Sequence, residues 1–209
     1  MGRRRSGSRG SASRSSKHDA RSGRRRPSFG VLVVGGIVIV VLGAFVAALI
    51  ATLGIGSEGV RASEPPWPPE KEHLQQRLEA LDLPPVGDES YHIHALLHVY
   101  VDGRPVTVPT NIGIDFSQGI ESSLHTHDTS GVIHMEAVHS YPYTLGDFFE
   151  VWGVRFSSTQ LGAYSNSGSK TVQIYVNGHQ ISDPTSYVLK ADDNIVVAYG
   201  VPGSFPKEP

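Results

Sequence analysis

Histidine is concentrated in one part of this chain. Six of the ten histidines lie between Tyr91 and Glu136, and the chain contains no cysteine. Imidazole nitrogen binds zinc, copper, nickel and iron, and carboxylate oxygen can join it as a ligand. Without thiolate, the softer Cu(I) ion is less favoured. These residue types therefore indicate a site for a divalent transition metal, either copper(II) or zinc.

The first group of histidines alternates with apolar residues. Within residues 91–101, apolar side chains occupy the odd positions from 93 onward, and His92, His94 and His98 occupy even positions. Successive side chains of a strand point to opposite faces, so the pattern predicts a strand with one apolar and one imidazole face. The Cβ atoms of His92 and His94 would be about 6 to 7 Å apart, so both rings could bind one ion. His98 would lie about 13 Å from His94 along the strand. We therefore expect His98 to be peripheral or to belong to another site.

The second group of histidines fits one face of a hairpin. If residues 128–131 form a four-residue loop, His125 faces His134 with Cβ atoms about 5 Å apart. His127 and Glu136 then lie on the same face as this pair. The opposite face, suited to packing, carries Leu124, Thr126, Ile133 and Met135.

The predicted ligand set follows from these two patterns. Its nucleus is His125, His127 and His134, and His94 and His92 are supporting candidates if the two segments come together. Two carboxylates are expected to orient ligands by accepting a hydrogen bond from the second ring nitrogen, namely Glu136 and Asp128.

A single histidine on a strand usually makes only hydrogen bonds or faces solvent. The alternative to a metal site is therefore a polar or pH-sensitive surface. His18, His139 and His179 lie outside both patterns and are expected to bind no metal. The His-x-His-x-Asp-His motif of metallo-β-lactamases is only partly matched after His125, and Gly-x-Ser-x-Gly and phosphate loops are absent from the sequence. No catalytic residue is therefore assigned.

Hairpin turns are predicted beside the histidine segments. Asp102-Gly103 is a two-residue turn signal that would pair Val99 with Val106. Further strands are predicted over residues 171–176 and 194–199 from their alternating apolar pattern.

One packed helix is predicted between the hairpins. Thr144 is a suitable N-cap, an apolar stripe follows, and Gly153 would end the helix. This order of elements predicts an α+β fold, specifically a small β-grasp-like domain of antiparallel hairpins with one packed helix. A cupredoxin-like β-sandwich is the alternative.

The start of the chain has a different composition. Residues 1–29 contain ten Lys or Arg and one Asp, a balance of +9, against −11 for the remainder. Their Ser, Gly and Arg content predicts a disordered basic tail in the cytoplasm. Nucleic-acid or lipid binding is one interpretation of such a tail, but a topology signal is favoured because an apolar segment follows. We therefore expect no nucleic-acid partner.

A single transmembrane helix is predicted over residues 30–54. Residues 31–53 carry no charge, and about 20 apolar residues are enough to cross a bilayer. A signal peptide cleaved before Ser63 is the alternative, although the apolar region of a signal is usually about 7 to 15 residues long. The basic flank predicts a cytoplasmic N-terminus and an extracytoplasmic C-terminal domain in the cell membrane.

The chain after the predicted transmembrane helix is predicted to consist of a linker up to residue 90 and a folded domain from residue 91. Residues 55–90 are predicted to form a Pro-rich linker, in which Pro65–Pro69 is a stiff spacer and residues 70–81 form a short helix. Residues 91–209 are predicted to form the extracytoplasmic His-rich metal-binding domain.

Four motifs together resemble a family of membrane-anchored, His-rich extracytoplasmic proteins of bacteria and archaea. They are His92-x-His94, Val101-Asp-Gly-x-Pro-Val-x-Val-Pro109, Leu124-His-Thr-His-Asp-x-Ser-Gly-x-Ile-His134 and Tyr143-Thr-Leu-Gly-Asp-Phe-Phe-x-x-Trp-Gly153. The resemblance covers roughly residues 84–201 and implies a membrane-anchored outer domain, but no established activity.

The function expected from the sequence is metal binding through histidines, for sensing, buffering or delivery of copper or zinc. A metal-dependent hydrolase or oxidase with an open coordination position is one alternative. An envelope interaction module with a structural metal, or with none, is another. The expected partners are the membrane and the metal ion, and the sequence names no protein partner.

Overall fold

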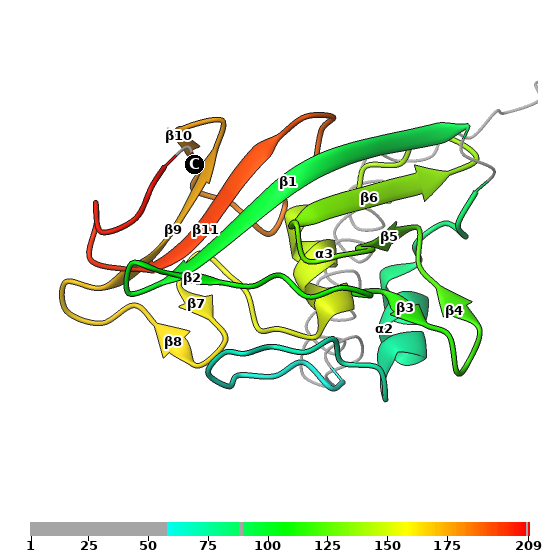
Figure 1. Ribbon diagram of the computed structural model, residues 1–209, viewed down its shortest axis with the longest axis horizontal. Coiled ribbons are helices and arrows are strands. Elements are labelled where there is room, and N and C mark those ends of the chain that lie inside the picture. Colours follow the sequence, from blue (N-terminus) through cyan, green and yellow to red (C-terminus); the bar gives the residue numbers. More distant parts are fainter. Residues whose placement is uncertain (1–57, 88–89, 208) are drawn as a thin grey trace, which may run out of the picture. The chain divides into compact units, whose positions relative to one another are not determined.

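The computed structural model describes residues 58–87, 90–207 and 209 (Figure 1). The predicted basic tail at 1–29 and the predicted transmembrane helix at 30–54 lie outside these residues. Among the residues that are described, we find no helix with the length and apolar character needed to span a bilayer.

The described chain forms an α+β fold with mostly antiparallel strands and two helices. The elements follow in the order α2 (Leu74–Leu81), β1 (Tyr91–Val101), β2 (Arg104–Val106), β3 (Ile114–Asp115), β4 (Ile120–Glu121), β5 (Leu124–His125), β6 (Val132–Ala137), α3 (Leu145–Trp152), β7 (Gln160–Leu161), β8 (Tyr164–Ser165), β9 (Thr171–Val176), β10 (His179–Gln180) and β11 (Asn194–Gly200). The predicted α+β class is confirmed.

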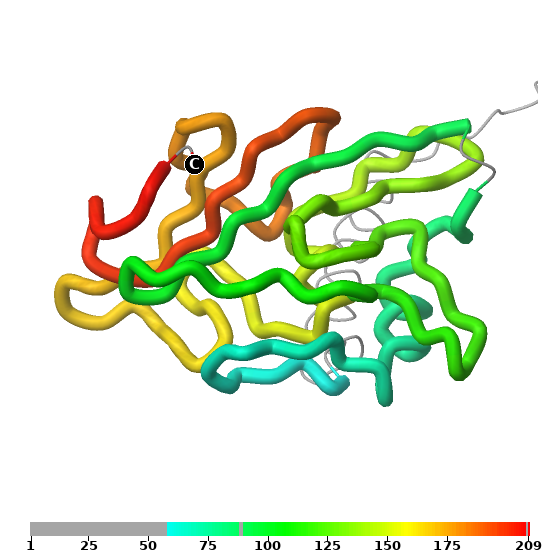
Figure 2. The backbone as a smooth tube through the Cα atoms, viewed as in Figure 1, coloured from blue at the N-terminus to red at the C-terminus, as the bar shows by residue number. Residues whose placement is uncertain are grey.

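A seven-stranded sheet organises these elements. Its order is β10-β9-β11-β1-β6-β5, and β2 pairs with the end of β1. The long strand β1 pairs in parallel with β11 and antiparallel with β6 and β2. Figure 2 shows β1 running between the C-terminal strands and the β5–β6 hairpin. Strand β1 therefore joins segments that are far apart in the sequence.

The predicted hairpin registers are confirmed. Asp102 and Gly103 both have positive φ angles, as a tight turn between twisted strands requires, and Val99 pairs with Val106. In the second hairpin His125 pairs with His134. The Val99–Val106 and Leu124–Met135 pairs both pack in the main core, on one side of the sheet.

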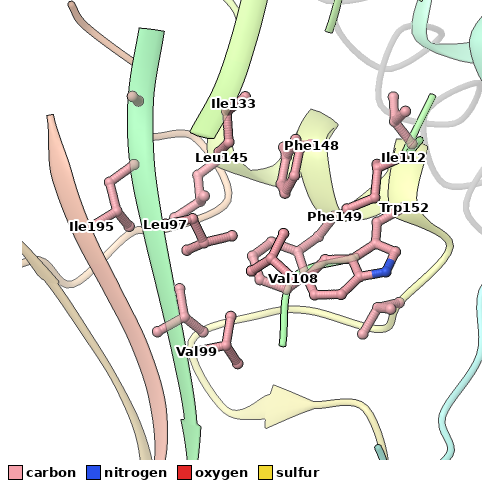
Figure 3. Packing of buried hydrophobic residues seen from close by; sticks show 14 of the residues in the cluster. Leu97, Val99, Val108, Ile112, Ile133, Leu145, Phe148, Phe149, Trp152 and Ile195 are labelled. Carbon is pink, nitrogen blue, oxygen red and sulfur yellow. The ribbon is translucent and has the colours of Figure 1, made fainter. Parts of the chain in front are cut away.

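Helix α3 begins and ends where the sequence predicts. The Thr144 side chain accepts a hydrogen bond from Asp147 N, the Asp147 carboxylate accepts one from Thr144 N, and Gly153 ends the helix in the left-handed conformation. Phe148 and Phe149 are buried on the same side of β1 as the apolar strand residues (Figure 3). One face of the sheet is therefore covered by α3, an arrangement that differs from the two packed sheets of the alternative sandwich.

The segment before the sheet packs on the domain instead of standing apart as a spacer. Trp67 is 1% exposed and belongs to the main core. Its indole Nε1 donates to Ser63 O at 2.9 Å, and its carbonyl accepts from Trp152 Nε1 at 2.9 Å. Burial of a large aromatic side chain stabilises a fold strongly. The burial of Trp67 therefore holds the Pro-rich segment against α3.

The short helix in this segment begins later than predicted, at Leu74 instead of residue 70. Glu70 is held outside the helix because its N–H donates to Trp152 O and its carboxylate forms an ion pair with Arg77. The Arg77 side chain is fully buried, and it also donates to the carbonyls of Glu58 and Val151. Tertiary contacts therefore set the start of α2.

Candidate metal centre

A row of three histidines crosses three neighbouring strands on the sheet face opposite α3. His94 of β1 lies directly opposite His134 of β6, and His134 lies directly opposite His125 of β5. The next cross-strand pair along the same face is His92 and Glu136. Directly opposed residues share a face with Cβ atoms about 5 Å apart, so the pairing of β1 with β6 brings the two predicted histidine segments together.

Three imidazoles converge at the β1 side of this row. His134 Nδ1 is 3.1 Å from His94 Nε2 and 3.3 Å from His92 Nε2. Two nitrogens bound to one tetrahedral zinc ion at about 2.0 to 2.1 Å are about 3.3 to 3.4 Å apart. The spacing of these three nitrogens therefore suits a shared ion.

A second group converges at the β5 side. His125 Nε2 is 3.0 Å from His127 Nε2, and Glu136 Oε1 is 3.7 Å from His125 Nε2 and 3.4 Å from His134 Nδ1. The donor atoms of these four residues all lie within 4.8 Å of one another. The predicted nucleus of His125, His127 and His134 thus comes together, and Glu136 lies among the donors themselves.

The buried His125 is oriented by a backbone carbonyl. Its Nδ1 is 2.8 Å from Ser122 O. Since a carbonyl only accepts, Nδ1 carries the proton and Nε2 presents a lone pair toward His127 and Glu136. This is the usual arrangement of a metal-binding histidine. The sequence contains no signal for this contact, because any residue type at position 122 supplies the same carbonyl.

The local electrostatics keep two of the imidazoles neutral. Burial, together with the nearby His94, His125 and His127, lowers the pKa of His134 to about 4. Burial is also the largest effect on His125, whose pKa is lowered. A metal binds only the unprotonated nitrogen, so both residues are in the binding form at neutral pH.

The ends of the site differ in exposure. His125 and Glu136 are buried, His92 and His134 are half-buried, and His94 and His127 are exposed. The arrangement therefore has a buried floor and an open rim.

The loop that carries His127 is fixed from two sides. Leu97 N donates to Gly131 O at 2.9 Å, and Gly131 has a φ of +88°. A Cβ at this position would lie 2.3 Å from Leu97 O. On the other side, Thr110 Oγ1 donates to the carbonyl of His127. Close backbone approach therefore requires glycine at position 131.

Two other predicted residues lie outside both groups. Asp128 is exposed, and its carboxylate accepts a hydrogen bond from Ser130 N at 2.8 Å, which stabilises the loop. His98 lies four residues beyond His94, opposite Val196 of β11, and burial lowers its pKa. Within the described chain, His98 Nε2 is buried without a hydrogen-bond partner.

The other histidines among the described residues do not join the centre. His139 and His179 are exposed, and His18 lies outside the described residues. His73 forms a separate group with Glu70 and Glu72. The Glu70 carboxylate there is already paired with Arg77, so that group is explained by the packing of the segment before the sheet.

Comparisons with protein-family models, with curated proteins and with solved structures found no match.

Proposed function

We propose that the described domain binds a divalent transition metal, copper(II) or zinc, for sensing, buffering or delivery of the ion. One observation carries the proposal. Four donor atoms, from His125, His127, His134 and Glu136, lie within 4.8 Å of one another, and the buried His125 already presents an unprotonated Nε2. Such convergence of imidazole nitrogens has no evident use in packing a core.

The exposure of the donors supports reversible binding. His127 and His94 are exposed at the rim, while His125 and Glu136 form the buried floor. A structural zinc site is usually closed by four protein ligands. An open rim instead allows an incoming or outgoing ligand to reach the ion, as sensing, buffering and delivery require.

The location outside the cytoplasm is a proposal from sequence. The uncharged residues 31–53 and the basic residues 1–29 support a single membrane anchor with its N-terminus in the cytoplasm. The absence of cysteine from the whole chain leaves histidine and carboxylate as the ligands in that compartment.

A metal-dependent hydrolase or oxidase is the second candidate. A hollow of about 260 Å³ adjoins the site and is lined by residues that include His94, Leu96 and Val132. The Glu136 carboxylate lies beside the candidate ligands. A metal with an open coordination position could activate a bound water here. Turnover of a small substrate would distinguish this candidate from a carrier.

The β-grasp-like description of the fold also belongs with the proposals. It is supported by the parallel pairing of β1 with β11 and by the packing of α3 on one sheet face. The β5–β6 hairpin on the other edge of β1 departs from a minimal hairpin-helix-hairpin arrangement.

Elemental analysis of the purified full-length chain tests metal binding. We expect copper or zinc in the wild-type protein and little in a variant with His125, His127 and His134 changed to Ala. A variant with the exposed His139 and His179 changed to Ala is the matched control and should retain the metal. Equal and negligible metal in all three proteins after incubation with either ion would reject the proposal.

A further inference from the structure

We propose that the centre holds two metal ions, with a second position formed by His92, His94 and Nδ1 of His134. This inference rests on the proposed function, since it concerns the capacity of the same metal centre. The first position then uses His125, His127 and Glu136.

The distribution of the donors argues against a single ion. The five histidines and Glu136 supply six ligand residues, whereas zinc in proteins is usually four-coordinate. They fall into two groups that are compact within 4.8 Å, and His134 is the residue common to both. Two ligands of one ion cannot be more than about 4.2 Å apart. The donors are therefore too widely spread for one ion to use them all.

The second group supplies three nitrogens at metal-ligand spacing. His92 Nε2 and His94 Nε2 lie 3.3 Å and 3.1 Å from His134 Nδ1. Both strands that carry these residues belong to the seven-stranded sheet, and the facing pairs are in regular register. The position thus needs no rearrangement of the backbone.

Glu136 is placed to connect the two positions. Its Oε1 atom is 2.9 Å from His92 Nε2 at one position and 3.7 Å from His125 Nε2 at the other. A carboxylate between two cations reduces their mutual repulsion, and in two-metal sites the ions are about 3.5 to 4 Å apart. The buried Glu136 side chain supplies this negative charge where the two groups meet.

Titration of the metal-free full-length chain with Zn²⁺ tests the inference, with calorimetry and elemental analysis after desalting as readouts. Wild type should bind two equivalents. The His92→Ala/His94→Ala variant should bind one, and the His139→Ala/His179→Ala control should bind two. Near-ultraviolet circular dichroism of the buried Trp67 and Trp152 checks that each variant is folded, and His92→Gln/His94→Gln replaces the Ala pair if it is not.

The outcomes separate the two claims. One equivalent in wild type, unchanged by the His92 and His94 substitutions, would overturn the second position and leave the proposed function intact. No binding by wild type would overturn both. With two equivalents of Cu²⁺, coupling of neighbouring ions should broaden or remove the paramagnetic resonance signal of isolated Cu²⁺. Two full, uncoupled signals would contradict a shared centre.

Discussion

His134 on β6 lies directly opposite His94 on β1, with 3.1 Å between His134 Nδ1 and His94 Nε2. The two residues are 40 positions apart in the sequence. The centre is therefore assembled by the pairing of two strands that belong to different hairpins, and an ion bound there links β1 to β6.

Metal binding should stabilise the fold, because the ion binds the assembled strands and not the unfolded chain. At a free metal concentration of 100 times Kd, the free energy of unfolding should rise by about 2.7 kcal/mol. Thermal denaturation with and without Zn²⁺ measures this gain. His134→Ala should remove most of it and His139→Ala none. An equal gain in both variants would place the ion elsewhere.

The metal-free domain should lose stability as the pH falls from about 6.5 to about 4. The pKa of His134 is lowered from 6.5 to about 4 in the folded state. In this window the unfolded chain binds a proton that the folded domain resists, so acidification favours unfolding. Urea denaturation at pH 7, 5.5 and 4 measures the trend. His134→Gln should show a weaker pH dependence than wild type, and identical profiles would contradict the role of this group.

Glu136→Gln should weaken metal binding by at least about 10- to 100-fold, the range for losing a partner that only orients a metal ligand. The substitution keeps the size of the side chain but removes its negative charge. Asp128→Asn is the matched control, because Asp128 accepts from Ser130 N in the loop and lies outside both donor groups. Calorimetric Kd values for both variants provide the comparison. Similar losses would mean that only the general charge of the surface matters.

Gly131→Ala should destabilise the domain and weaken metal binding. The new Cβ would lie 2.3 Å from Leu97 O, which forces the loop that carries His127 away from β1. Gly168→Ala imposes a positive φ on alanine in the same way, but its Cβ would meet nothing within 4 Å. We expect a cost for Gly131→Ala that exceeds that for Gly168→Ala by about 1 to 3 kcal/mol. Chemical denaturation of both variants checks the difference.

Trp67→Ala should cost about 3 to 5 kcal/mol of unfolding free energy, as is typical of a buried aromatic residue changed to Ala. The indole is 1% exposed and lies 6.0 Å, centroid to centroid, from the Trp152 ring. His179→Ala on the exposed strand β10 should change the stability by less than about 0.5 kcal/mol. A small effect of Trp67→Ala would mean that residues 58–87 contribute little to the fold.

The sequence alone determined the local features of this protein. Alternation of side chains separated a histidine face from an apolar face on each segment, and turn residues fixed the register that pairs His125 with His134. The capping residues Thr144 and Gly153 likewise set the bounds of α3. These features depend on residues close together in the chain, where backbone geometry leaves few alternatives.

Only the tertiary structure decided how these parts meet. No periodicity specifies that β1 pairs with β6 so that His94 faces His134, or that β1 also pairs in parallel with β11. The contact of His125 with the Ser122 carbonyl and the burial of Trp67 also depend on long-range packing and backbone atoms. The sequence therefore determined which residues could bind a metal. The pairing of distant strands, driven by burial of the apolar face that they share, decided that five of those histidines lie together.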